Sequence, residues 1–396
     1  MNTFGRTEVT HLTREQERLL RDGTPAERKA MELLVALGEI YGAERLIEVT
    51  SVHVSGASYK IIGDAGLEFL QEFSKTARVK VRTTVNPVGM DLRAWRELGI
   101  PEDFASKQAS IVEAYRRMGV EETWSCIPYQ IGNRPGPGEH VAWAESSAAI
   151  FANSILGART NREGGPSALA AGITGWTPDY GLHLDENRRA TTRVRVSPSI
   201  RGYEYSLLGH CLGKILGSGV PLIEGLRGTE DELKALGAAM ATSSEINMFH
   251  VRGVTPEWDA ADASGLEEIR ISEAEFKEAK EQLLSADDYE MIAFGCPQLS
   301  EIELEEVADL METYRPKVPV WAFTSRAIAA RAAEVIGRIR ESGGRVVLDT
   351  CPEVMPLNLV AREVGSPSAK AAVYLPSLSG QRVLIDDSEE LMRRKG

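Results

Sequence analysis

The sequence predicts a multi-domain α/β protein in which mostly parallel sheets are flanked by helices. Its 396 residues exceed the length of a typical single domain. Hydrophobic residues make up 43% of the chain and charged residues 26%, a balance typical of a globular core with a solvated surface. Short apolar runs rich in branched side chains alternate with longer amphipathic segments, and this alternation is typical of parallel sheets covered by helices.

The N-terminal part of the chain is expected to open on two amphipathic helices, because apolar side chains recur there at helical spacing. These helices are expected over residues 13–22 and 25–41. Further along, strands are expected over 46–54, 79–84 and 122–125, and helices over 102–118 and 143–156. Residues 159–167 are expected to form a long polar loop that leads into an Ala-rich helix.

A charged segment over 257–288 contains few large apolar residues, and we place a domain boundary near residue 284. Residues 1–283 are then an N-terminal α/β region, and residues 284–396 are a C-terminal α/β domain. Within the C-terminal domain, strands are expected over 290–294, 318–323 and 345–348, and helices over 300–314 and 325–342. Ser300 and Glu303 have the spacing of a capping box at the start of the first of these helices.

The charge balance excludes several classes of partner. With 45 Lys and Arg against 58 Asp and Glu, the formal net charge is −13, which repels nucleic acid and anionic membrane surfaces. The first 22 residues carry several charges and no apolar core of a signal peptide, and no later run is apolar enough for a membrane span. We therefore expect a cytoplasmic protein that binds neither nucleic acid nor a membrane.

The four cysteines are too few and too scattered for a disulfide framework. Cys126, Cys296 and Cys351 each follow an expected strand, and a proline stands one or two residues after each of them. The edge of an α/β sheet where the strands end commonly binds ligands, and three thiolates there could hold one soft metal centre. Spacing alone leaves this open, because free cysteines often serve as small core residues. Cys211 lies in a helical pattern and is expected to fill the core.

Three loops are candidates for binding an anion. The turn at Gly56, Ala57 and Ser58 and the Asn86-Pro87 pair both end expected strands, where backbone N–H groups become exposed. Ser368 and Lys370 supply a hydroxyl and an ammonium in a third loop. The alternative in each case is an ordinary turn or a solvated lysine. No Walker loop, no Gly-x-Gly-x-x-Gly turn after a strand and no His-Glu-x-x-His pair is found.

Several motifs resemble the aconitase X family over about residues 50 to 375. They are His53 to Tyr59, Cys126-Ile127-Pro128-Tyr129, Ala144-Glu145-Ser146-Ser147, Asn153-Ser154, the 157–167 segment, Gly295-Cys296-Pro297 and Asp349-Thr350-Cys351-Pro352. The resemblance implies an iron–sulfur cluster, of the 4Fe–4S type, held by Cys126, Cys296 and Cys351, with one iron free of protein ligands. It also implies substrate contacts from Gly56, Ala57, Ser58, Asn86, Pro87, Glu145, Ser146, Ser368 and Lys370. If Glu145 is buried on the expected helix, it needs a cationic partner such as Arg159 or Arg162.

The resemblance implies a hydro-lyase. The sequence is most similar to the split form of the family, in which the large and small parts of the enzyme are separate subunits. The implied reaction removes water from (R)-5-phosphomevalonate to give trans-anhydromevalonate 5-phosphate, a step of a modified mevalonate pathway for isoprenoid synthesis. The family's basic serine lies on a swivelling domain for which the chain leaves no room before Gly396. A small partner subunit is therefore expected to form a heterodimer with this chain. The alternatives are a cis-3-hydroxy-L-proline dehydratase and a non-catalytic scaffold.

Overall fold

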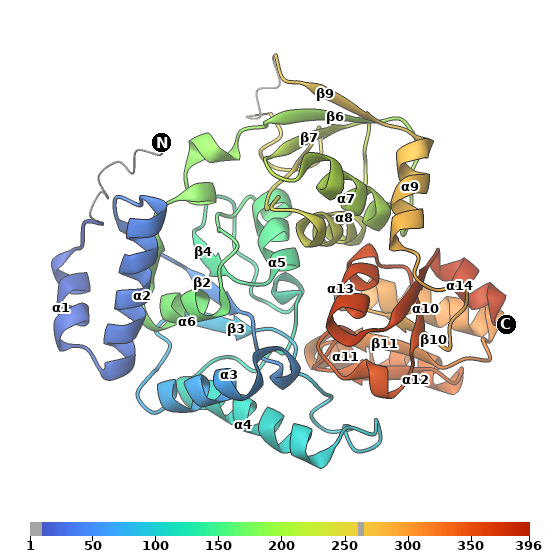
Figure 1. Ribbon diagram of the computed structural model, residues 1–396, viewed down its shortest axis with the longest axis horizontal. Coiled ribbons are helices and arrows are strands. Elements are labelled where there is room, and N and C mark those ends of the chain that lie inside the picture. The colour runs from blue at the N-terminus through green and yellow to red at the C-terminus, as the bar shows by residue number, and fades with distance from the viewer. Residues whose placement is uncertain (1–9, 260–264) are drawn as a thin grey trace.

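The computed structural model describes residues 10–259 and 265–396, so residues 260–264 of the charged segment lie outside the described residues. The described chain forms four sheets of two, three, four and five strands. Every strand pair in the three larger sheets is parallel, and helices cover these sheets (Figure 1). The predicted α/β fold is confirmed.

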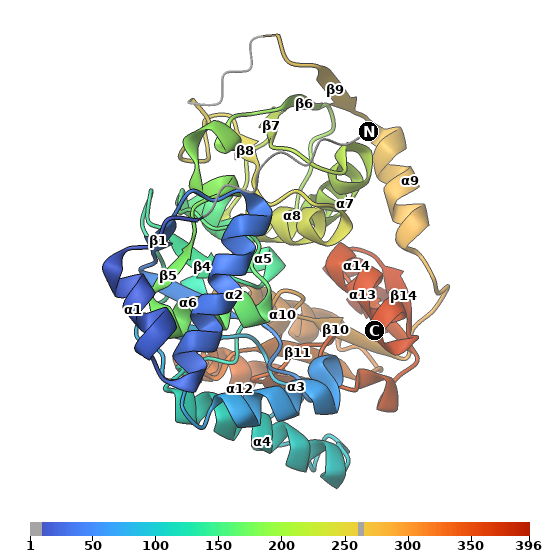
Figure 2. The same ribbon diagram turned by 60° about the vertical axis from the view of Figure 1, so that its left-hand side comes forward.

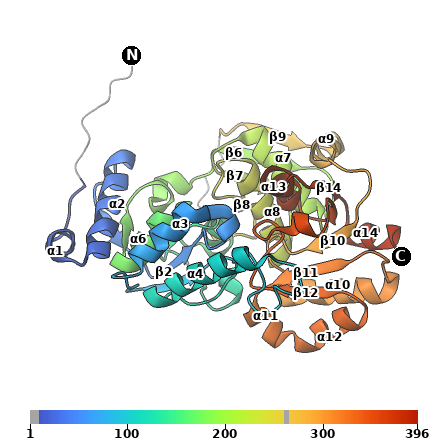
Figure 3. The same cartoon turned by 60° about the horizontal axis from the view of Figure 1, so that its bottom comes forward.

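The first two helices agree with the prediction. α1 spans Arg14–Asp22 and α2 spans Pro25–Tyr41, and each begins at a threonine that forms a capping box with the residue three positions later. α2 packs against α6 (Gly165–Thr174). Both N-terminal helices lie at one end of the molecule, opposite the C-terminal helix α14 (Ser388–Arg394), as Figure 3 shows.

The strand predicted over 46–54 is two strands in two different sheets. β1 (Leu46–Glu48) pairs antiparallel with β5 (Trp176–Pro178), whereas β2 (Ser51–Val54) lies in a parallel sheet. Between them, Val49 donates its N–H to Gly175 and Thr50 donates to His140. The chain thus passes from one sheet to the other at residues that carry no glycine or proline signal.

The three-stranded sheet has the order β3-β2-β4. β3 is Arg82–Val85, β4 is Val141–Trp143, and the neighbouring helices α3 and α4 span Tyr59–Phe73 and Glu102–Met118. The strand predicted over 122–125 is absent, because the bridge to β3 is an isolated one at Glu121, just before this segment, and Trp124 turns to a φ of 43°. Cys126 follows this segment rather than a strand and precedes the short helix η1 (Pro128–Gln130).

The helix predicted over 143–156 is divided into three parts. Trp143 ends strand β4, helix α5 covers Ser146–Phe151, and one turn of π-helix, η2, covers Ala152–Leu156 before Gly157. Trp143 pairs through its backbone with His53 of β2, so sheet formation overrides helical propensity at this end. Glu145 is consequently the N-cap residue of α5, and Ser146 is the first helical residue.

The four-stranded sheet has the order β8-β7-β6-β9, and the sequence analysis identified none of its strands. They are β6 (Thr192–Val196), β7 (Pro221–Glu224), β8 (His250–Val251) and β9 (Glu268–Ile271). The helices of this part are η3 (Gly181–His183), η4 (Asp185–Arg188), α7 (Glu204–Leu216), α8 (Glu230–Ser243) and α9 (Glu273–Leu283). α9 leads from β9 toward the last sheet (Figure 2).

The five-stranded sheet has the order β12-β11-β10-β13-β14. Its strands are β10 (Met291–Phe294), β11 (Val320–Thr324), β12 (Arg345–Leu348), β13 (Glu363–Ser366) and β14 (Arg382–Ile385). Its helices are α10 (Glu301–Tyr314), α11 (Arg326–Arg331), α12 (Ala333–Glu341), η5 (Leu357–Leu359), α13 (Ala369–Ser379) and α14. The chain order of the strands reverses between β10 and β13, which is where ligands bind in open parallel sheets.

Two local predictions for this sheet have different outcomes. The capping box of Ser300 and Glu303 at the start of α10 is confirmed. The helix predicted over 325–342 is instead two helices, because Ala332 leaves helical geometry with φ of −97° and ψ of 31°.

The hydrophobic cores join the sheets rather than keeping them apart. One core cluster contains side chains from both the four-stranded and the five-stranded sheets. A second packs the segment from Cys126 to Ala158 against the five-stranded sheet. The three-stranded and five-stranded sheets meet near the carboxyl ends of their strands, because Val88, shortly after β3, donates its N–H to the carbonyl oxygen of Asp349, directly after β12. In the described ranges, each helix is too short or too polar to span a membrane.

Candidate functional site

Three cysteines from distant parts of the chain lie at the junction of the three-stranded and five-stranded sheets. Cys296 follows β10, Cys351 follows β12, and Cys126 follows a segment that is hydrogen-bonded to the end of β3 through Ser125. All three side chains are buried. The predicted position beyond the carboxyl end of a strand is correct for Cys296 and Cys351, whereas Cys126 reaches the same place through an irregular loop.

The backbone takes a left-handed turn just before each of these cysteines. Trp124 has a φ of 43° and Asp349 a φ of 64°, and each stands two residues before its cysteine. Gly295, directly before Cys296, has a φ of 111°, and a Cβ at this glycine would lie 2.4 Å from the carbonyl oxygen of Phe323. Backbone conformations that cost energy are concentrated at functional sites, and here they orient all three thiols.

One buried glutamine joins the three cysteine loops. The backbone N–H of Gln298 donates to the Cys126 sulfur at 3.2 Å. Its side-chain amide donates to the carbonyl oxygen of Trp124 at 3.2 Å and to that of Thr350, next to Cys351, at 3.0 Å. Because Gln298 itself belongs to the Cys296 loop, a single side chain fixes the relative positions of all three loops.

The thiols are neutral in this environment. Burial, together with the nearby Glu145 carboxylate, raises the pKa of Cys126 to about 12. Burial and the Glu353 carboxyl likewise raise the pKa values of Cys296 and Cys351 far above the ordinary range. Thiolates at these positions therefore require a strong positive charge beside them, such as that of bound metal.

A buried ion pair lies beside the cysteines. The Lys370 ammonium donates to Glu145 Oε1 at 2.8 Å, and both side chains are largely shielded from solvent. Burial alone would raise the pKa of Glu145, but the Lys370 charge, with hydrogen bonds from Asn86 and Ser147, holds that pKa at about 2. Asn86 continues the network, because its side-chain oxygen lies 2.8 Å from His53 Nε2.

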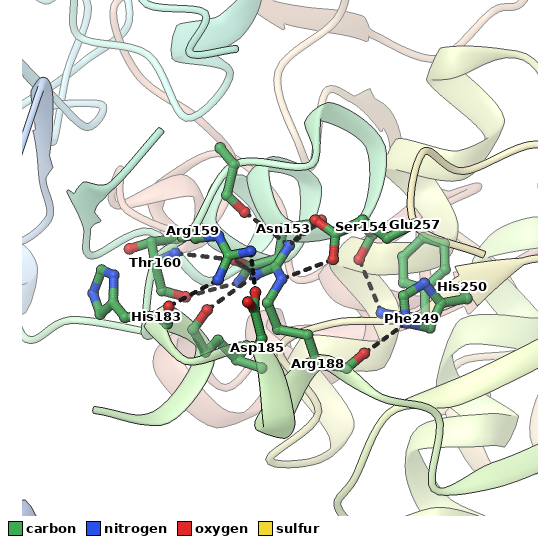
Figure 4. Close-up of polar contacts among 12 residues, drawn as sticks. Asn153, Ser154, Arg159, Thr160, His183, Asp185, Arg188, Phe249, His250 and Glu257 are labelled. Atoms are coloured by element: carbon green, nitrogen blue, oxygen red, sulfur yellow. Dashed lines mark hydrogen bonds and ion pairs between the residues drawn. The ribbon is translucent and has the colours of Figure 1, made fainter. Parts of the chain in front are cut away.

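The prediction that Arg159 or Arg162 neutralises Glu145 is wrong. Arg159 donates to Asp185 and to the backbone oxygen of His183, in the network drawn in Figure 4. Arg162 donates to backbone oxygens at the end of α8. Because β4 ends at Trp143 and Glu145 caps α5, the carboxylate points toward the lysine of α13 instead of toward the 159–167 loop.

The first turn predicted to bind an anion is tied to the Cys351 loop. The Ser58 hydroxyl donates to the Val354 carbonyl oxygen at 2.7 Å, and Ser58 is the N-cap residue of α3 without a side-chain cap hydrogen bond. Gly56 and Ala57 precede it. Among the described residues, the N–H groups of Gly56, Ala57 and Ser58 have no acceptor.

The other predicted substrate contacts converge on the same region. Asn86 and Pro87 are buried, and the next residue, Val88, donates its N–H to the Asp349 carbonyl oxygen at 2.9 Å. Ser368 caps α13 and donates its hydroxyl to the Cys296 carbonyl oxygen at 2.5 Å. Ser146 is half-buried at the start of α5. Hydrogen bonds thus join the loops of the predicted residues to one another.

Sequence reasoning missed four side chains that complete this region. Glu353 is hydrogen-bonded to the Cys296 thiol, and Lys60 donates to the carbonyl oxygens of Glu353 and Met355 at 2.7 and 3.0 Å. Gln298 and Ser147 are the other two. A signal was available for Gln298 and Glu353, since both stand directly after a Cys-Pro pair.

Cys211 has no contact with the other three cysteines among the hydrogen bonds of the described residues. It is on α7 and belongs to the hydrophobic core around the four-stranded sheet, as predicted. Within residues 10–259 and 265–396, no group of three His, Cys, Asp or Glu side chains is arranged to hold a single metal ion.

Comparisons with known proteins agree with this arrangement. Family models described as the first, second and third domains of aconitase X match residues 9–186, 190–281 and 289–396. The phosphomevalonate dehydratase large subunit of Methanothermobacter thermautotrophicus is 48% identical over 97% of this chain and 98% of its own length. The cis-3-hydroxy-L-proline dehydratase of Pseudomonas aeruginosa is 36% identical over 93% of this chain but 67% of its own length.

A solved structure gives the same result in three dimensions. The crystal structure of Thermococcus kodakaraensis aconitase X in its holo form is 43% identical to this chain and superposes with a TM-score of 0.91, covering 98% of this chain and 100% of that one. The family models match nearly the whole described chain, the relatives are named as dehydratases, and the fold is shared. This chain therefore belongs to the aconitase X family.

Proposed function

We propose that this chain is the large subunit of a phosphomevalonate dehydratase, a hydro-lyase that removes water from (R)-5-phosphomevalonate to give trans-anhydromevalonate 5-phosphate. Four relatives with that name are 43 to 48% identical over 97% of this chain. They match over 96 to 99% of their own length, whereas the two cis-3-hydroxy-L-proline dehydratases extend well beyond the matched region. The higher identity to these four relatives, against 36% for the two cis-3-hydroxy-L-proline dehydratases, favours the phosphomevalonate-type enzyme.

The observation that carries the proposal is the set of three buried cysteine loops joined by Gln298. Three thiols with one N–H donor directed at a sulfur are a donor set suited to an iron–sulfur cluster. A cluster differs from a single ion because each thiolate binds a different iron, so the sulfurs need not converge on one point. Cys126, Cys296 and Cys351 would hold a 4Fe–4S cluster and leave one iron without a protein ligand.

The reaction has two difficulties. Hydroxide is a poor leaving group, and the C2 proton beside a carboxylate is only weakly acidic. The cluster, when bound, supplies a Lewis-acidic iron for the departing hydroxyl and the carboxylate. The buried ion pair of Glu145 and Lys370 would place a carboxylate and an ammonium beside the bound cluster. The hydrogen bond from Ser368 to the Cys296 carbonyl oxygen keeps the start of α13 against the Cys296 loop.

The turn at Gly56, Ala57 and Ser58 would orient an anionic end of the substrate. α3 begins there without a side-chain cap, and helix N-termini with available N–H groups favour negative charge. The side-chain donors of Ser58 and Asn86 are used within the protein, on Val354 and Glu145, so backbone N–H groups are the better candidates for this contact. Asn86, Pro87 and Ser146 would then shape the walls around the substrate.

The proton acceptor is proposed to be a serine of a small partner subunit. The relatives are named large subunits, which implies such a partner for them. In this chain, three serine hydroxyls of the candidate site already donate to protein groups: Ser58 to Val354, Ser147 to Glu145 and Ser368 to Cys296. The chain would hold the cluster and the substrate, and the partner would close over them.

The test is an anaerobic assay of the reconstituted chain, alone and with the small subunit, on phosphomevalonate and on cis-3-hydroxy-L-proline. We expect the two-subunit complex to dehydrate phosphomevalonate and the chain alone to show little or no turnover. Turnover of hydroxyproline alone would replace the proposed substrate. No turnover of either substrate by an iron-loaded complex would favour a scaffold. Full activity of the isolated chain would place the base in this chain.

A further inference from the structure

A cavity of about 350 Å³ lies against the edge strand β12, and its lining includes none of the residues proposed above for the cluster or substrate. One wall is the segment between Asp91 and Leu98, and the other is β12 with the end of α12. The two walls are joined by hydrogen bonds, because Asp91 accepts the N–H of Leu348 at 3.0 Å and Arg345 donates to the Glu97 carbonyl oxygen at 3.3 Å. The edge of the sheet is thus covered, and the cavity remains between the covering segment and the strand.

The lining of this cavity is positively charged in a protein that is strongly negative overall. It contains four arginines against two acidic residues, a formal excess of two positive charges, whereas the whole chain carries −13. The arginines are Arg93, Arg326, Arg340 and Arg345, and the acidic residues are Asp91 and Glu97. A local field of this sign attracts small anions that the rest of the surface repels.

Several of these guanidinium groups keep donors available. In the described part of the chain, the side chains of Arg93 and Arg340 form neither an ion pair nor a hydrogen bond. Arg326 uses Nε and Nη2 on Asp349 and Nη2 on Asp91, which leaves its Nη1 without a protein acceptor. Planar guanidinium forks match the oxygens of phosphate groups better than any other protein cation.

Arg326 also connects this cavity with the candidate site. Its partner Asp349 stands two residues before Cys351, adopts a left-handed backbone and accepts the N–H of Val88, two residues after Asn86. A ligand that orders Arg326 would therefore act on the two segments that carry Cys351 and Asn86.

We propose that this cavity is a second ligand site, which binds a small phosphate-bearing or diphosphate-bearing anion through Arg93, Arg326 and Arg340. The site is distinct from the proposed substrate site, and its occupancy stabilises the segment before Cys351 through the pair of Arg326 and Asp349. Because binding and stabilisation are reciprocal, ligands at the two sites would influence each other's affinity.

The test is calorimetric titration of the full chain with inorganic phosphate and with diphosphate under anaerobic conditions. The variants Arg93→Gln and Arg340→Gln each remove one unpaired guanidinium, and each is expected to weaken binding about tenfold. The matched control is Arg338→Gln, which lies on α12 like Arg340. The Arg338 side chain does not line the cavity, because it pairs with Glu305, Asp309 and Glu312 of α10. The control should bind as the wild type does.

Two outcomes would overturn the second site. One is the absence of saturable binding of phosphate or diphosphate by the wild type. The other is binding that Arg93→Gln and Arg340→Gln both leave unchanged, because the anion would then lie elsewhere, for example at the proposed substrate turn.

The connection to Cys351 is tested by amide hydrogen exchange. Diphosphate at a concentration that just saturates the wild type is expected to slow exchange over residues 348–355 in the wild type and in Arg338→Gln, and to slow it less in Arg340→Gln. Unchanged exchange in the wild type at saturation would contradict the connection through Arg326.

Discussion

Glu145 and Lys370 form a buried ion pair that connects the three-stranded and five-stranded sheets. Glu145 caps α5 just after β4, and Lys370 lies in the first turn of α13, so the pair joins segments 225 residues apart. Both charges lose hydration on folding, and each is tolerated only because the other is present. A change at either residue therefore affects stability as well as function.

Replacing Lys370 by methionine is expected to lower the free energy of unfolding by roughly 3 to 5 kcal/mol, because Glu145 is left buried without its cation. The double variant Glu145→Gln with Lys370→Met should recover a large part of this loss, since the orphan charge is gone. Urea unfolding of both variants and of the wild type checks this. A double variant less stable than Lys370→Met would contradict the pairing.

Gln298 is expected to be a positioning residue for the cysteine loops. Gln298→Ala removes the donors to Trp124 and Thr350 and should cost about 1 to 3 kcal/mol of stability. Gln381→Ala is the matched control, because Gln381 is a similarly buried glutamine that donates to the Ala361 carbonyl oxygen away from the cysteines. Both variants should lose stability, but only Gln298→Ala should lose iron after reconstitution. Equal iron content in the two variants would refute this role.

His53 makes stability depend on pH. Burial lowers the pKa of its imidazole from 6.5 to about 4, although the hydrogen bond with Asn86 acts in the opposite direction. The folded protein therefore keeps His53 neutral while the unfolded chain binds a proton below about pH 6.5, so this stabilisation is present above pH 6.5 and is lost as the pH falls toward 4.

The variant His53→Gln should reduce the fall of unfolding free energy between pH 6.5 and 4 by up to about 1.4 kcal/mol per pH unit. Urea unfolding at several pH values measures the slope. His11→Gln, which changes an exposed histidine, should retain the wild-type slope. An unchanged slope in His53→Gln would mean that His53 is protonated equally in both states.

At the scale of single residues, the sequence predicted which side chains matter better than it predicted their partners. The cysteines and Glu145 stand in motifs, whereas Lys370 was expected in a loop and instead lies in the first turn of α13. The pairing of Glu145 with Lys370 depends on where α5 begins and how α13 docks. Arg159 and Arg162 lie much closer to Glu145 in the sequence than Lys370 does. Tertiary packing directed them to Asp185 and to the end of α8 instead.

At the scale of elements, the site depends on tight connections at the carboxyl ends of strands. Gly295 shows this most clearly. Its φ is 111°, and a Cβ added at this position would collide with the Phe323 carbonyl oxygen, so there is no space for a side chain. Gly295→Ala is expected to cost about 3 kcal/mol or more and to displace Cys296.

The control for Gly295→Ala is Gly343→Ala, at a φ of 87° with nothing within 4 Å of the added Cβ. This control isolates the backbone strain, and it should cost about 1 kcal/mol. Thermal unfolding and iron content measure both variants. Equal losses of stability would show that the contact with Phe323 is relieved easily.

Elements with strong local signals were predicted well, and elements shaped by neighbours were not. The capped helices α1, α2 and α10 have their starting residues encoded locally. The break between β1 and β2 has no local signal, because it follows from hydrogen bonds to Gly175 and His140. The π-helical turn of η2 and the short strands of the four-stranded sheet are likewise set by tertiary contacts.

At the scale of the whole molecule, the three-stranded and five-stranded parallel sheets present the carboxyl ends of their strands to one interior region. Cys126 comes from the first part of the chain and Cys296 and Cys351 from the last, so neither part alone contains the three thiols. The sequence predicted the α/β class from the alternation of strands and helices. It could not predict how the sheets face each other, because shared hydrophobic cores determine that arrangement.

The central claim is that Cys126, Cys296 and Cys351 together hold one iron–sulfur cluster. The most direct test is the iron and acid-labile sulfide content of the chain after anaerobic reconstitution. We predict about four iron atoms per chain for the wild type and for Cys211→Ala, and a large loss of both elements in each of Cys126→Ser, Cys296→Ser and Cys351→Ser. Full iron content in any of the three serine variants, or its loss in Cys211→Ala, would contradict the claim.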